Sequence, residues 1–530
     1  MAVRGMSVDA TRDWQAAEQF SAQGQVEQAR PLYLGLLEDR AIAPYAHLRL
    51  SVADQQAGDI RGAVGHALDA FGKAHADPAL LEMLCKLLLR LGETRAALAC
   101  ANALLGMSAS AGALAEVGKM LSDHMLPDAA LSLLRRAMAE GMANAPAMQY
   151  LLGLNLMYAG DLGAAERALE TSVRGNPGLA PAHWALAKMG NEAGRGDRIG
   201  RLRALLQGPD GNGNDASLLW YSLFHELDRD DQVAAAWPAL EEAMRIRRRQ
   251  VRYDEPAQEA LFAEATQALR LAVDAPVDVA TQGPAPIFIV GLPRSGTTVI
   301  EQALCREADV ASVGELRDLP AQMRWVAERA GPFHVDAGLL QAVGRDQLRS
   351  LGERYLAHTQ WRARGHAFFA DKWPENYLAI GHILASLPNA RVVCVRRGGA
   401  DACFSNLKEW FAASYPYSYT QEEVARQYIR YEAFLRRVRE VGSSRVAFVE
   451  YETFVRQPQV AIEALKLLLG LPGRTSPQPS ESVPTASAVQ VRSSVSTRHV
   501  GSWARYAAWL GPMLDELERG GFPQDRGGAP

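Results

Sequence analysis

The sequence predicts two parts of different fold class: an all-α superhelix of helical repeats, followed by an α/β domain with a parallel sheet. Two observations support this prediction. Glycines recur about every 34 residues through the first half, and an apolar stretch runs into a loop of small residues at Pro286–Thr298. A period of this length is typical of stacked helix pairs, and a buried strand followed by a tight loop and a helix is typical of α/β folds.

The composition is that of a folded protein with more than one domain. The chain has 530 residues, more than one ordinary hydrophobic core contains. Hydrophobic residues make up 48% and charged residues 22%, and the net charge of −4 leaves no basic surplus for nucleic acid. The first residues lack a signal-peptide core and no apolar run reaches membrane-spanning length, so we expect a cytoplasmic protein without a membrane partner.

Cysteine usage agrees with a reducing compartment. The five cysteines are scattered, and none forms a C-x-x-C pair. No cluster of histidine, cysteine and carboxylate residues has the spacing of metal ligands in the sequence. We therefore predict no metal site.

The repeats share a register set by a turn residue and a small residue. The turn positions, 33 to 35 residues apart, are Gly24, Gly58, Gly92, Met125, Gly160 and Gly194. Five residues after them stand Ala29, Ala63, Ala97, Ala130, Ala165 and, in the last unit, Ile199. Glycine suits the turn between two helices, and alanine lets the helices approach closely. The pattern resembles tetratricopeptide repeats and predicts an array over residues 10–272, with a looser seventh unit at 216–249 and a final helix at 254–272.

Two features of this array are interpreted as follows. Such arrays commonly bind an extended peptide or another protein on their concave face, but a scaffold or dimerisation surface remains an equal alternative. The basic cluster Arg245–Arg252 is interpreted as a solvated helix end. A linker rich in proline and small residues follows at 273–285.

The stretch Pro286–Thr298 predicts an anion site. Ile287–Val290 is typical of a buried strand, and the pattern becomes helical from Ser295 onward. Backbone N–H groups and the positive end of the helix dipole would then converge on one point. Gly291 and Gly296 have the spacing of a nucleotide-binding loop, but Thr297 stands where nucleotide triphosphatases carry lysine, which favours a single terminal phosphate.

The string Pro293-Arg-Ser-Gly-Thr-Thr298 after this strand resembles the 5′-phosphosulfate loop of sulfotransferases that use 3′-phosphoadenosine-5′-phosphosulfate (PAPS). The resemblance covers roughly residues 285–520 and is closest to the tyrosylprotein-sulfotransferase-like branch and to bacterial proteins that join such a domain to tetratricopeptide repeats. It implies a P-loop-like sulfotransferase domain over 286–525. The residues that it assigns to the 5′ end of PAPS are Arg294, Ser295, Gly296, Thr297 and Thr298.

The resemblance also assigns catalytic residues. Glu315, 21 residues after Arg294, matches the catalytic base of the tyrosylprotein sulfotransferases, and a carboxylate suits the removal of an acceptor proton. Lys372, after the short apolar strand 367–370, matches the lysine that bonds the bridging oxygen of PAPS and strengthens that bond as the leaving phosphate gains charge. His366 is an alternative base, although no histidine follows Lys372 directly as in cytosolic sulfotransferases.

The 3′-phosphate motif of the family is an arginine with a serine eight residues later. Arg397 and Ser405 fit it, after the predicted strand 391–395, and a guanidinium can bind phosphate through two hydrogen bonds. The usual Asp-Pro is replaced by Gly398–Gly399, which puts the rigidity of the loop in question. Glu409 stands where some families place a cation, and Lys408 is the candidate to compensate for it.

Further nucleotide contacts are implied near the end of the domain. Tyr451, after the predicted strand 446–450, matches a tyrosine that contacts the nucleotide. The segment 485–492 resembles the lid over the cofactor, where Ser487 would help to hold the sulfuryl group and Gln490 and Arg492 would bind PAPS. Trp503 matches a tryptophan of the family, but Ser502 replaces the lysine before it, and either Arg498 or Arg505 would have to supply that charge.

These assignments predict direct transfer of a sulfuryl group from PAPS to an acceptor hydroxyl, with no metal. Protein tyrosine, a carbohydrate and a small phenol remain open as acceptors. The aromatic loop 410–419 is either part of an acceptor pocket or a packed surface loop. The alternatives are a repeat scaffold with a degenerate nucleotide-binding domain and, disfavoured by the missing lysine, a P-loop phosphotransferase. Because the assigned phosphate contacts all lie after residue 285, that part alone is expected to bind the nucleotide.

Overall fold

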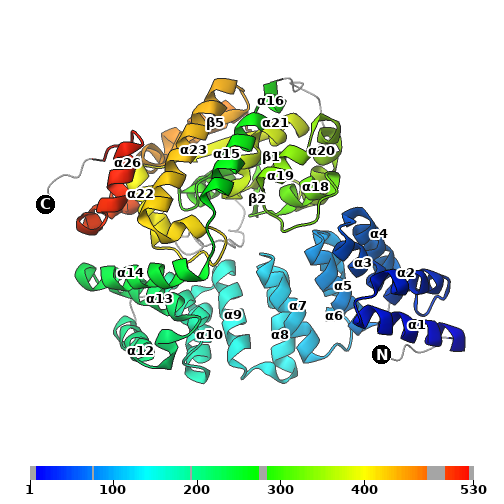
Figure 1. The fold of residues 1–530 in the computed structure, drawn as a ribbon. Coiled ribbons are helices and arrows are strands. Elements are labelled where there is room, and N and C mark those ends of the chain that lie inside the picture. Colours follow the sequence, from blue (N-terminus) through cyan, green and yellow to red (C-terminus); the bar gives the residue numbers. More distant parts are fainter. Residues whose placement is uncertain (1–6, 74–76, 191–193, 274–282, 474–495, 525–530) are drawn as a thin grey trace. The chain divides into compact units, whose positions relative to one another are not determined.

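The first half of the chain is all-helical, and the second half contains one five-stranded parallel sheet, as predicted (Figure 1). The computed structural model describes residues 7–73, 77–190, 194–273, 283–473 and 496–524. Every helix in those ranges is too short or too polar to cross a lipid bilayer. The chain divides into two compact units: residues up to 144 with 317–334 and 342–359, and residues 145–316, 335–341 and 360 onward.

The predicted repeat register is confirmed by the backbone. The five turn glycines have φ angles between +73° and +93°, and Met125 takes the same left-handed conformation with φ +58°. Glycine adopts this conformation without the steric cost that a side chain brings, so it recurs at these turns. The alanines five residues later are at most 2% exposed, and Ile199 is 6% exposed. They lie where two helices meet.

Helices of the first unit pack in consecutive pairs, coloured from blue to cyan in Figure 1. They are α1 (Val8–Ala22), α2 (Val26–Gly35), α3 (Ala43–Ala57), α4 (Ile60–Lys73), α5 (Pro78–Arg90), α6 (Thr94–Leu105), α7 (Ala111–Asp123) and α8 (Pro127–Ala137). The repeat helices of the second unit are α9 (Pro146–Ala159), α10 (Leu162–Gly175), α11 (Ala180–Met189), α12 (Arg195–Gln207), α13 (Ala216–Arg229) and α14 (Val233–Gln250). The looser seventh unit is the α13–α14 pair, on which α11 and α12 both pack. The helix predicted at 254–272 is divided into α15 (Glu255–Ala268) and α16 (Arg270–Val273).

The sheet has the strand order β2-β3-β1-β4-β5, and every neighbouring pair is parallel. Its strands are β1 (Ala285–Gly291), β2 (Val310–Gly314), β3 (Phe368–Asp371), β4 (Arg391–Arg396) and β5 (Val446–Glu450). Four of them were predicted within two residues at each end. The edge strand β2 was not predicted, because Ser312 interrupts its short apolar run.

Helices cover both faces of the sheet. One face packs on α17 (Thr297–Glu307), α24 (Tyr451–Arg456) and α25 (Pro458–Leu469) through a single apolar cluster. The other face meets the short helix η5 (Pro374–Ala379) and α23 (Gln421–Val441), where the rings of Tyr377 and Tyr431 lie 5.0 Å apart. Because both faces are covered, the inner strands β1 and β4 contain continuous apolar runs, which is why they could be recognised in the sequence.

Further helices lie between and after the strands in the chain, and those within 317–334 and 342–359 belong to the first unit. The further helices are α18 (Asp318–Val326), α19 (Ala337–Ala342), α20 (Arg345–Thr359), α21 (Ile380–Ser386), α22 (Gly399–Leu407), η6 (Pro416–Tyr419), η9 (Ser502–Trp509) and α26 (Gly511–Arg519).

Candidate active site

Each of the five strands leads into a residue or loop that the sequence assigns to the site. β1 leads into the loop with Arg294, and directly after β2, β3, β4 and β5 stand Glu315, Lys372, Arg397 and Tyr451. Because the strands are parallel, their carboxyl ends lie at one edge of the sheet. The chain runs from β1 to one side of the sheet and later crosses to β4 on the other, and α/β sheets bind ligands at such a reversal.

The loop after β1 is folded tightly. Arg294 and Gly296 have φ angles of +66° and +101°, and α17 begins at Thr297, two residues later than predicted. A Cβ atom on Gly291 would lie 2.6 Å from Ser295 Oγ, so only glycine allows this path. Ser295 Oγ is buried and has no hydrogen-bond partner among the described residues. A buried hydroxyl without a partner at a helix N-terminus fits an oxyanion.

The two predicted 3′-phosphate residues lie in contact. Arg397 Nη1 donates to Ser405 Oγ at 3.1 Å and to the carbonyl of Arg294 at 3.0 Å, which joins this pair to the loop after β1. Its guanidinium lies 4.9 Å from the ring centre of Tyr451, and burial lowers its pKa. Arg397 Nε is buried without a partner among the described residues. The arginine is thus held in place, and its Nε–H can donate to an anion.

The predicted base and the predicted leaving-group lysine form an ion pair. Lys372 Nζ donates to Glu315 Oε1. The lysine side chain is 1% exposed and the glutamate side chain 28% exposed. Gly314, with φ +77°, accepts from the backbone N–H of Lys372 at 2.9 Å, so the ends of β2 and β3 hold the two residues side by side. The sequence assigned each residue singly and did not predict the pair.

The alternative base lies away from this pair. His366 precedes β3, at the end of the strand opposite to Lys372, and its Nδ1 lies 2.6 Å from Asp309 Oδ1. An imidazole at the amino end of a parallel strand lies on the opposite edge of the sheet from Glu315. The geometry therefore favours Glu315 over His366.

Residues 286–475 match the model of the sulfotransferase family. This part of the chain is a sulfotransferase-family domain. The match supports a role in sulfuryl transfer.

Individual relatives are distant. A curated protein of Aquifex aeolicus (strain VF5), itself uncharacterized, is 26% identical over 256 residues, which cover 44% of this chain; the chain spans 32% of that relative's length. Among solved structures, a tetratricopeptide repeat protein from Parabacteroides merdae is 13% identical and covers 47% of this chain and 96% of its own, with a TM-score of 0.33. A sulfotransferase from Mycobacterium tuberculosis H37Rv is 16% identical, and the match covers 61% of this chain and 97% of that protein, with a TM-score of 0.26.

The sulfotransferase domain compensates for the replaced Asp-Pro. The backbone N–H of Gly398 donates to Glu452 Oε1 at 2.9 Å. A Cβ atom on Gly399 would lie 3.1 Å from a ring carbon of Tyr428, so this glycine permits close packing at the start of α22. The loop is therefore held by contacts rather than by a proline ring.

Asp401 is a structural member of the site that sequence reasoning missed. Its carboxylate lies 3.9 Å from Arg397 and accepts from the backbone N–H of Gly501 at 2.6 Å and of Trp503 at 3.3 Å. Ser502 Oγ, in the position of the family's lysine, also donates to it at 3.3 Å. An aspartate in the first turn of a helix is too common to signal such a role. Ser487, Gln490 and Arg492 lie outside the described residues.

Arg505 does not supply the charge that Ser502 lacks. Its guanidinium donates to Asp228 Oδ1 and Asp231 Oδ1, both at 2.7 Å, on the repeat side of the second unit. Arg498 is exposed and remains the candidate of the two.

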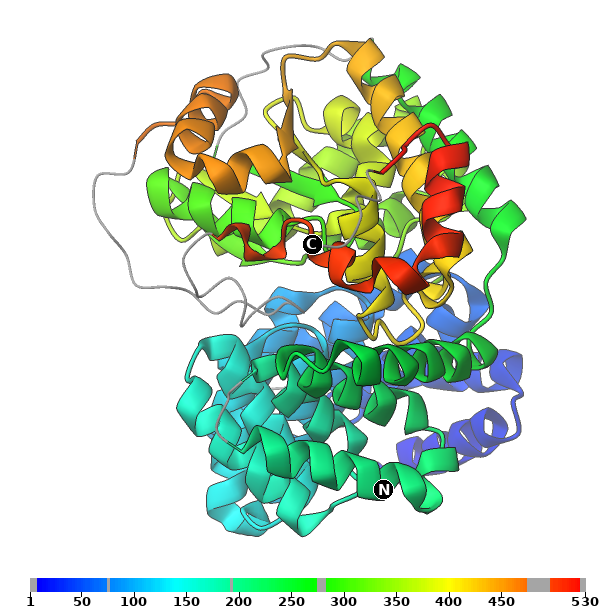
Figure 2. The ribbon, with the colours of Figure 1, turned by 90° about the vertical axis from the view of Figure 1, so that its left-hand side faces the viewer.

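The interpretation of 245–252 as a solvated helix end is wrong for two arginines. Arg247 Nε donates to the carbonyl of Ala412 at 3.1 Å, and its guanidinium lies 5.5 Å from the ring centre of Trp410. Arg248 makes an ion pair with Glu423 at 2.8 Å. The aromatic loop 410–419 is therefore packed against α14, and Figure 2 shows the yellow segment that follows α22 beside the green repeat helices.

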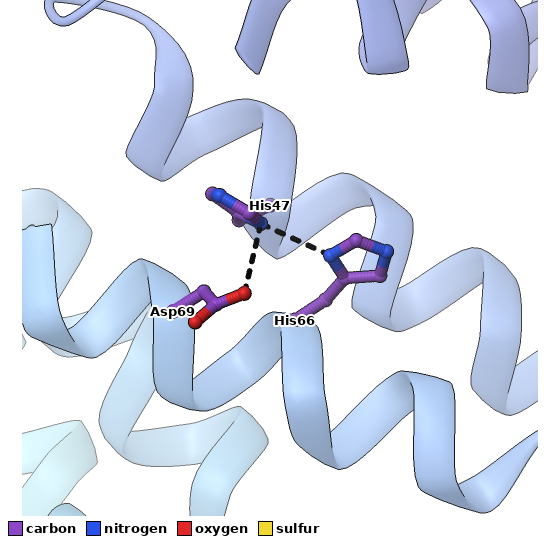
Figure 3. Close-up of side chains that lie close together, drawn as sticks. All are labelled: His47, His66 and Asp69. Carbon is purple, nitrogen blue, oxygen red and sulfur yellow. Dashed lines mark hydrogen bonds and ion pairs between the residues drawn. The ribbon is translucent and has the colours of Figure 1, made fainter.

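One group of side chains lies close enough together to hold a metal ion, although its spacing in the sequence gave no such signal. His47 on α3 and His66 and Asp69 on α4 bring three potential ligand atoms within 4.8 Å of one another (Figure 3). Sequence spacing missed them because two helices contribute. However, Lys73 Nζ lies 2.7 Å from His47 Nε2, and His47 Nδ1 lies 3.0 Å from His66 Nδ1. When Lys73 donates to His47 Nε2, the proton of His47 lies on Nδ1 and is donated to His66 Nδ1. The hydrogen bonds between these side chains therefore form without an ion.

Proposed function

We propose that this chain transfers a sulfuryl group from PAPS to an acceptor hydroxyl. The observation that carries the proposal is the Glu315–Lys372 ion pair at the same sheet edge as the loop after β1. A base for the acceptor and an acid for the leaving group are both needed for this reaction, and here they are adjacent. Protein tyrosine is the acceptor that a peptide-binding repeat array would serve.

The residues fit the nucleotide by charge and by hydrogen bonding. Arg294, Ser295, Gly296, Thr297 and Thr298 would hold its 5′ end, where Ser295 Oγ lacks a partner among the described residues. In a second group, Arg397 and Ser405 would hold the 3′-phosphate, and Tyr451 would contact the nucleotide. The lid residues Ser487, Gln490 and Arg492 remain predictions.

PAPS, when bound, supplies the activated sulfuryl group. The acceptor oxygen forms a bond to sulfur while the bond from sulfur to the bridging oxygen breaks, and the acceptor proton passes to Glu315. Lys372 donates to the bridging oxygen as negative charge develops there. In the ion pair each group keeps the other in place, and Lys372 must turn from Glu315 to the leaving oxygen during the reaction.

The repeats, the compartment and the cofactor needs complete the proposal. The array over 10–272, the linker over 273–285 and the sulfotransferase domain over 286–525 remain predicted boundaries. We propose a cytoplasmic protein whose transfer step needs no metal, whose repeats bind the acceptor or a protein partner, and which binds neither nucleic acid nor membrane.

Ligand-dependent stability tests the proposal. Adenosine 3′,5′-bisphosphate should raise the melting temperature, because a ligand that binds only the folded state stabilises it by RT ln(1 + [L]/Kd). Adenosine 5′-phosphate should give a much smaller shift, since Arg397 and Ser405 then have no phosphate to bind. Equal shifts from ATP and the bisphosphate would contradict it. Labelled PAPS added with the protein to a cell extract would then identify the acceptor.

A further inference from the structure

The repeat helices of the second unit reach the sulfotransferase site directly. Lys188, in the last turn of α11, makes an ion pair with Glu409 Oε2 at 2.6 Å. The same carboxylate oxygen lies 3.4 Å from Nε of Arg294 in the loop after β1. The exposed fractions of the three side chains are 10%, 4% and 11%. One buried carboxylate is therefore shared between a repeat lysine and the arginine assigned to the 5′ end of the nucleotide.

The surrounding repeat residues hold this arrangement. Arg229, at the end of α13, donates to the carbonyl of Lys188 at 3.3 Å and to that of Ala187. Tyr221 and His225, also on α13, donate to the carbonyls of Leu407 and Lys408 at 3.1 Å and 2.8 Å. Those carbonyls belong to the end of α22, where helices leave acceptors without internal partners. The repeats thus cap the helix that carries Ser405.

Charged side chains of both signs lie around this arrangement. Arg294, Arg397, Lys188 and Lys408 lie near the carboxylates of Glu409, Asp401 and Asp228. Burial is the main cause that lowers the pKa values of Lys188 and Lys408, each to about 8. A buried cation is costly without a counter-charge, so Lys188 is stabilised in this site by Glu409.

We propose that Lys188 is a positioning residue of the nucleotide site, supplied by the repeats, and this inference rests on the proposed function. Glu409 stands where related families place a cation, and alone it would compete with the ligand for Arg294. Lys188 neutralises Glu409, so this carboxylate competes less with the 5′-phosphosulfate end for the Arg294 guanidinium. The repeats thereby complete the site. If so, residues after 285 alone should bind the nucleotide more weakly than the full chain does.

Calorimetric titration of the full chain with adenosine 3′,5′-bisphosphate tests the inference. Lys188→Met should weaken binding about ten-fold, since the charge-assisted bond that reduces the competition of Glu409 for Arg294 is lost. Lys188→Arg should keep most of the affinity. The matched control is Lys86→Met, which removes a lysine with a similar 2.6 Å ion pair to Glu82 on α5, and it should bind as the unmodified protein does.

A double variant separates positioning from mere packing. Adding Glu409→Gln to Lys188→Met removes the carboxylate that competes for Arg294, so affinity should recover to within about three-fold of the unmodified protein. If the double variant binds as weakly as Lys188→Met, or if Lys188→Met binds normally, the inference is overturned. Should Lys188→Met not fold, Glu409→Gln alone decides: unchanged or tighter binding supports the inference and weaker binding overturns it.

Failure of the proposed function gives a different result. If the unmodified protein does not bind the bisphosphate, or binds ATP equally well, the proposed function is wrong and the inference falls with it. Normal binding by the unmodified protein with no effect of Lys188→Met overturns only the role of Lys188.

Discussion

At the scale of single residues, the Glu315–Lys372 ion pair explains how two reactive groups can be kept ready in one place. A lysine that is 1% exposed would be costly to bury without its carboxylate. The same pairing holds the Glu315 side chain at the sheet edge. Substitutions of the two residues should nevertheless fail in different ways.

Glu315→Gln keeps the size of the side chain and an oxygen that can accept from Lys372, but it removes the base. We expect a rate loss of about 10²–10⁴-fold with bisphosphate affinity nearly intact. Steady-state kinetics and calorimetry on the same preparation check this. An acceptor with a more acidic phenol needs less help from a base and should partly restore the rate. Near-normal turnover across neutral pH would show that Glu315 is not the base.

Lys372→Ala removes the donor to the leaving oxygen. Because that bond strengthens mainly in the transition state, kcat and kcat/KM should fall together. A more acidic acceptor should not rescue this variant, since the defect lies on the leaving-group side. A raised KM with unchanged kcat would instead assign Lys372 to ground-state binding of the nucleotide.

At the scale of the element, the repeat turns depend on a left-handed residue, and two glycines form a matched test. Gly58 has φ +84°, whereas Gly65 lies within α4; a Cβ atom at either position would meet nothing within 4 Å. Gly58→Ala should destabilise by about 1–2 kcal/mol through backbone strain. Gly65→Ala should stabilise by about 0.5–1 kcal/mol through helix propensity. Denaturant unfolding measures the change in the free energy of unfolding for both variants. If the two changes had the same sign, the assigned turn at Gly58 would be contradicted.

A buried carboxylate before α6 should make the stability of the first unit depend on pH. Burial raises the pKa of Glu93 from 4.5 to about 7, although Arg354 and His358 lie 3.8 Å away. Between these two values the folded state holds a proton that the unfolded chain has released, so this group makes stability fall as pH rises.

Glu93→Gln removes that titration. The free energy of unfolding of the variant, relative to the unmodified protein, should therefore increase between pH 5 and pH 8. The exposed Glu116→Gln in the same unit serves as the control and should show little change. A pH-independent difference for Glu93→Gln would contradict the shifted pKa.

At the scale of the whole molecule, the later repeats and the five-stranded sheet belong to one compact unit. Because Tyr221 and His225 of α13 donate to the end of α22, a nucleotide that stabilises the sheet edge should also stabilise α13 and α14. Hydrogen exchange with and without the bisphosphate should show slower exchange in both repeat helices and in the sheet. Slowing confined to residues after 285 would contradict this coupling.

The sequence by itself determined the features that depend on local pattern. The turn positions and buried alanines of the repeats follow from a period, and the strands, the loop after β1 and the residues at the strand ends follow from short apolar runs bounded by small residues. The strand signal lies within a few neighbouring residues, and the repeat signal is one such local pattern that recurs every 33 to 35 residues.

Only the tertiary structure decided which side chains meet. Lys188 and Glu409 are 221 residues apart in the chain, and Glu315 and Lys372 are 57 apart. The same holds for the contacts of Arg505 with Asp228 and for the histidines of α3 and α4. Such contacts depend on how helices and strands pack, and a lysine that pairs with a distant carboxylate has the same local sequence signal as one that faces water.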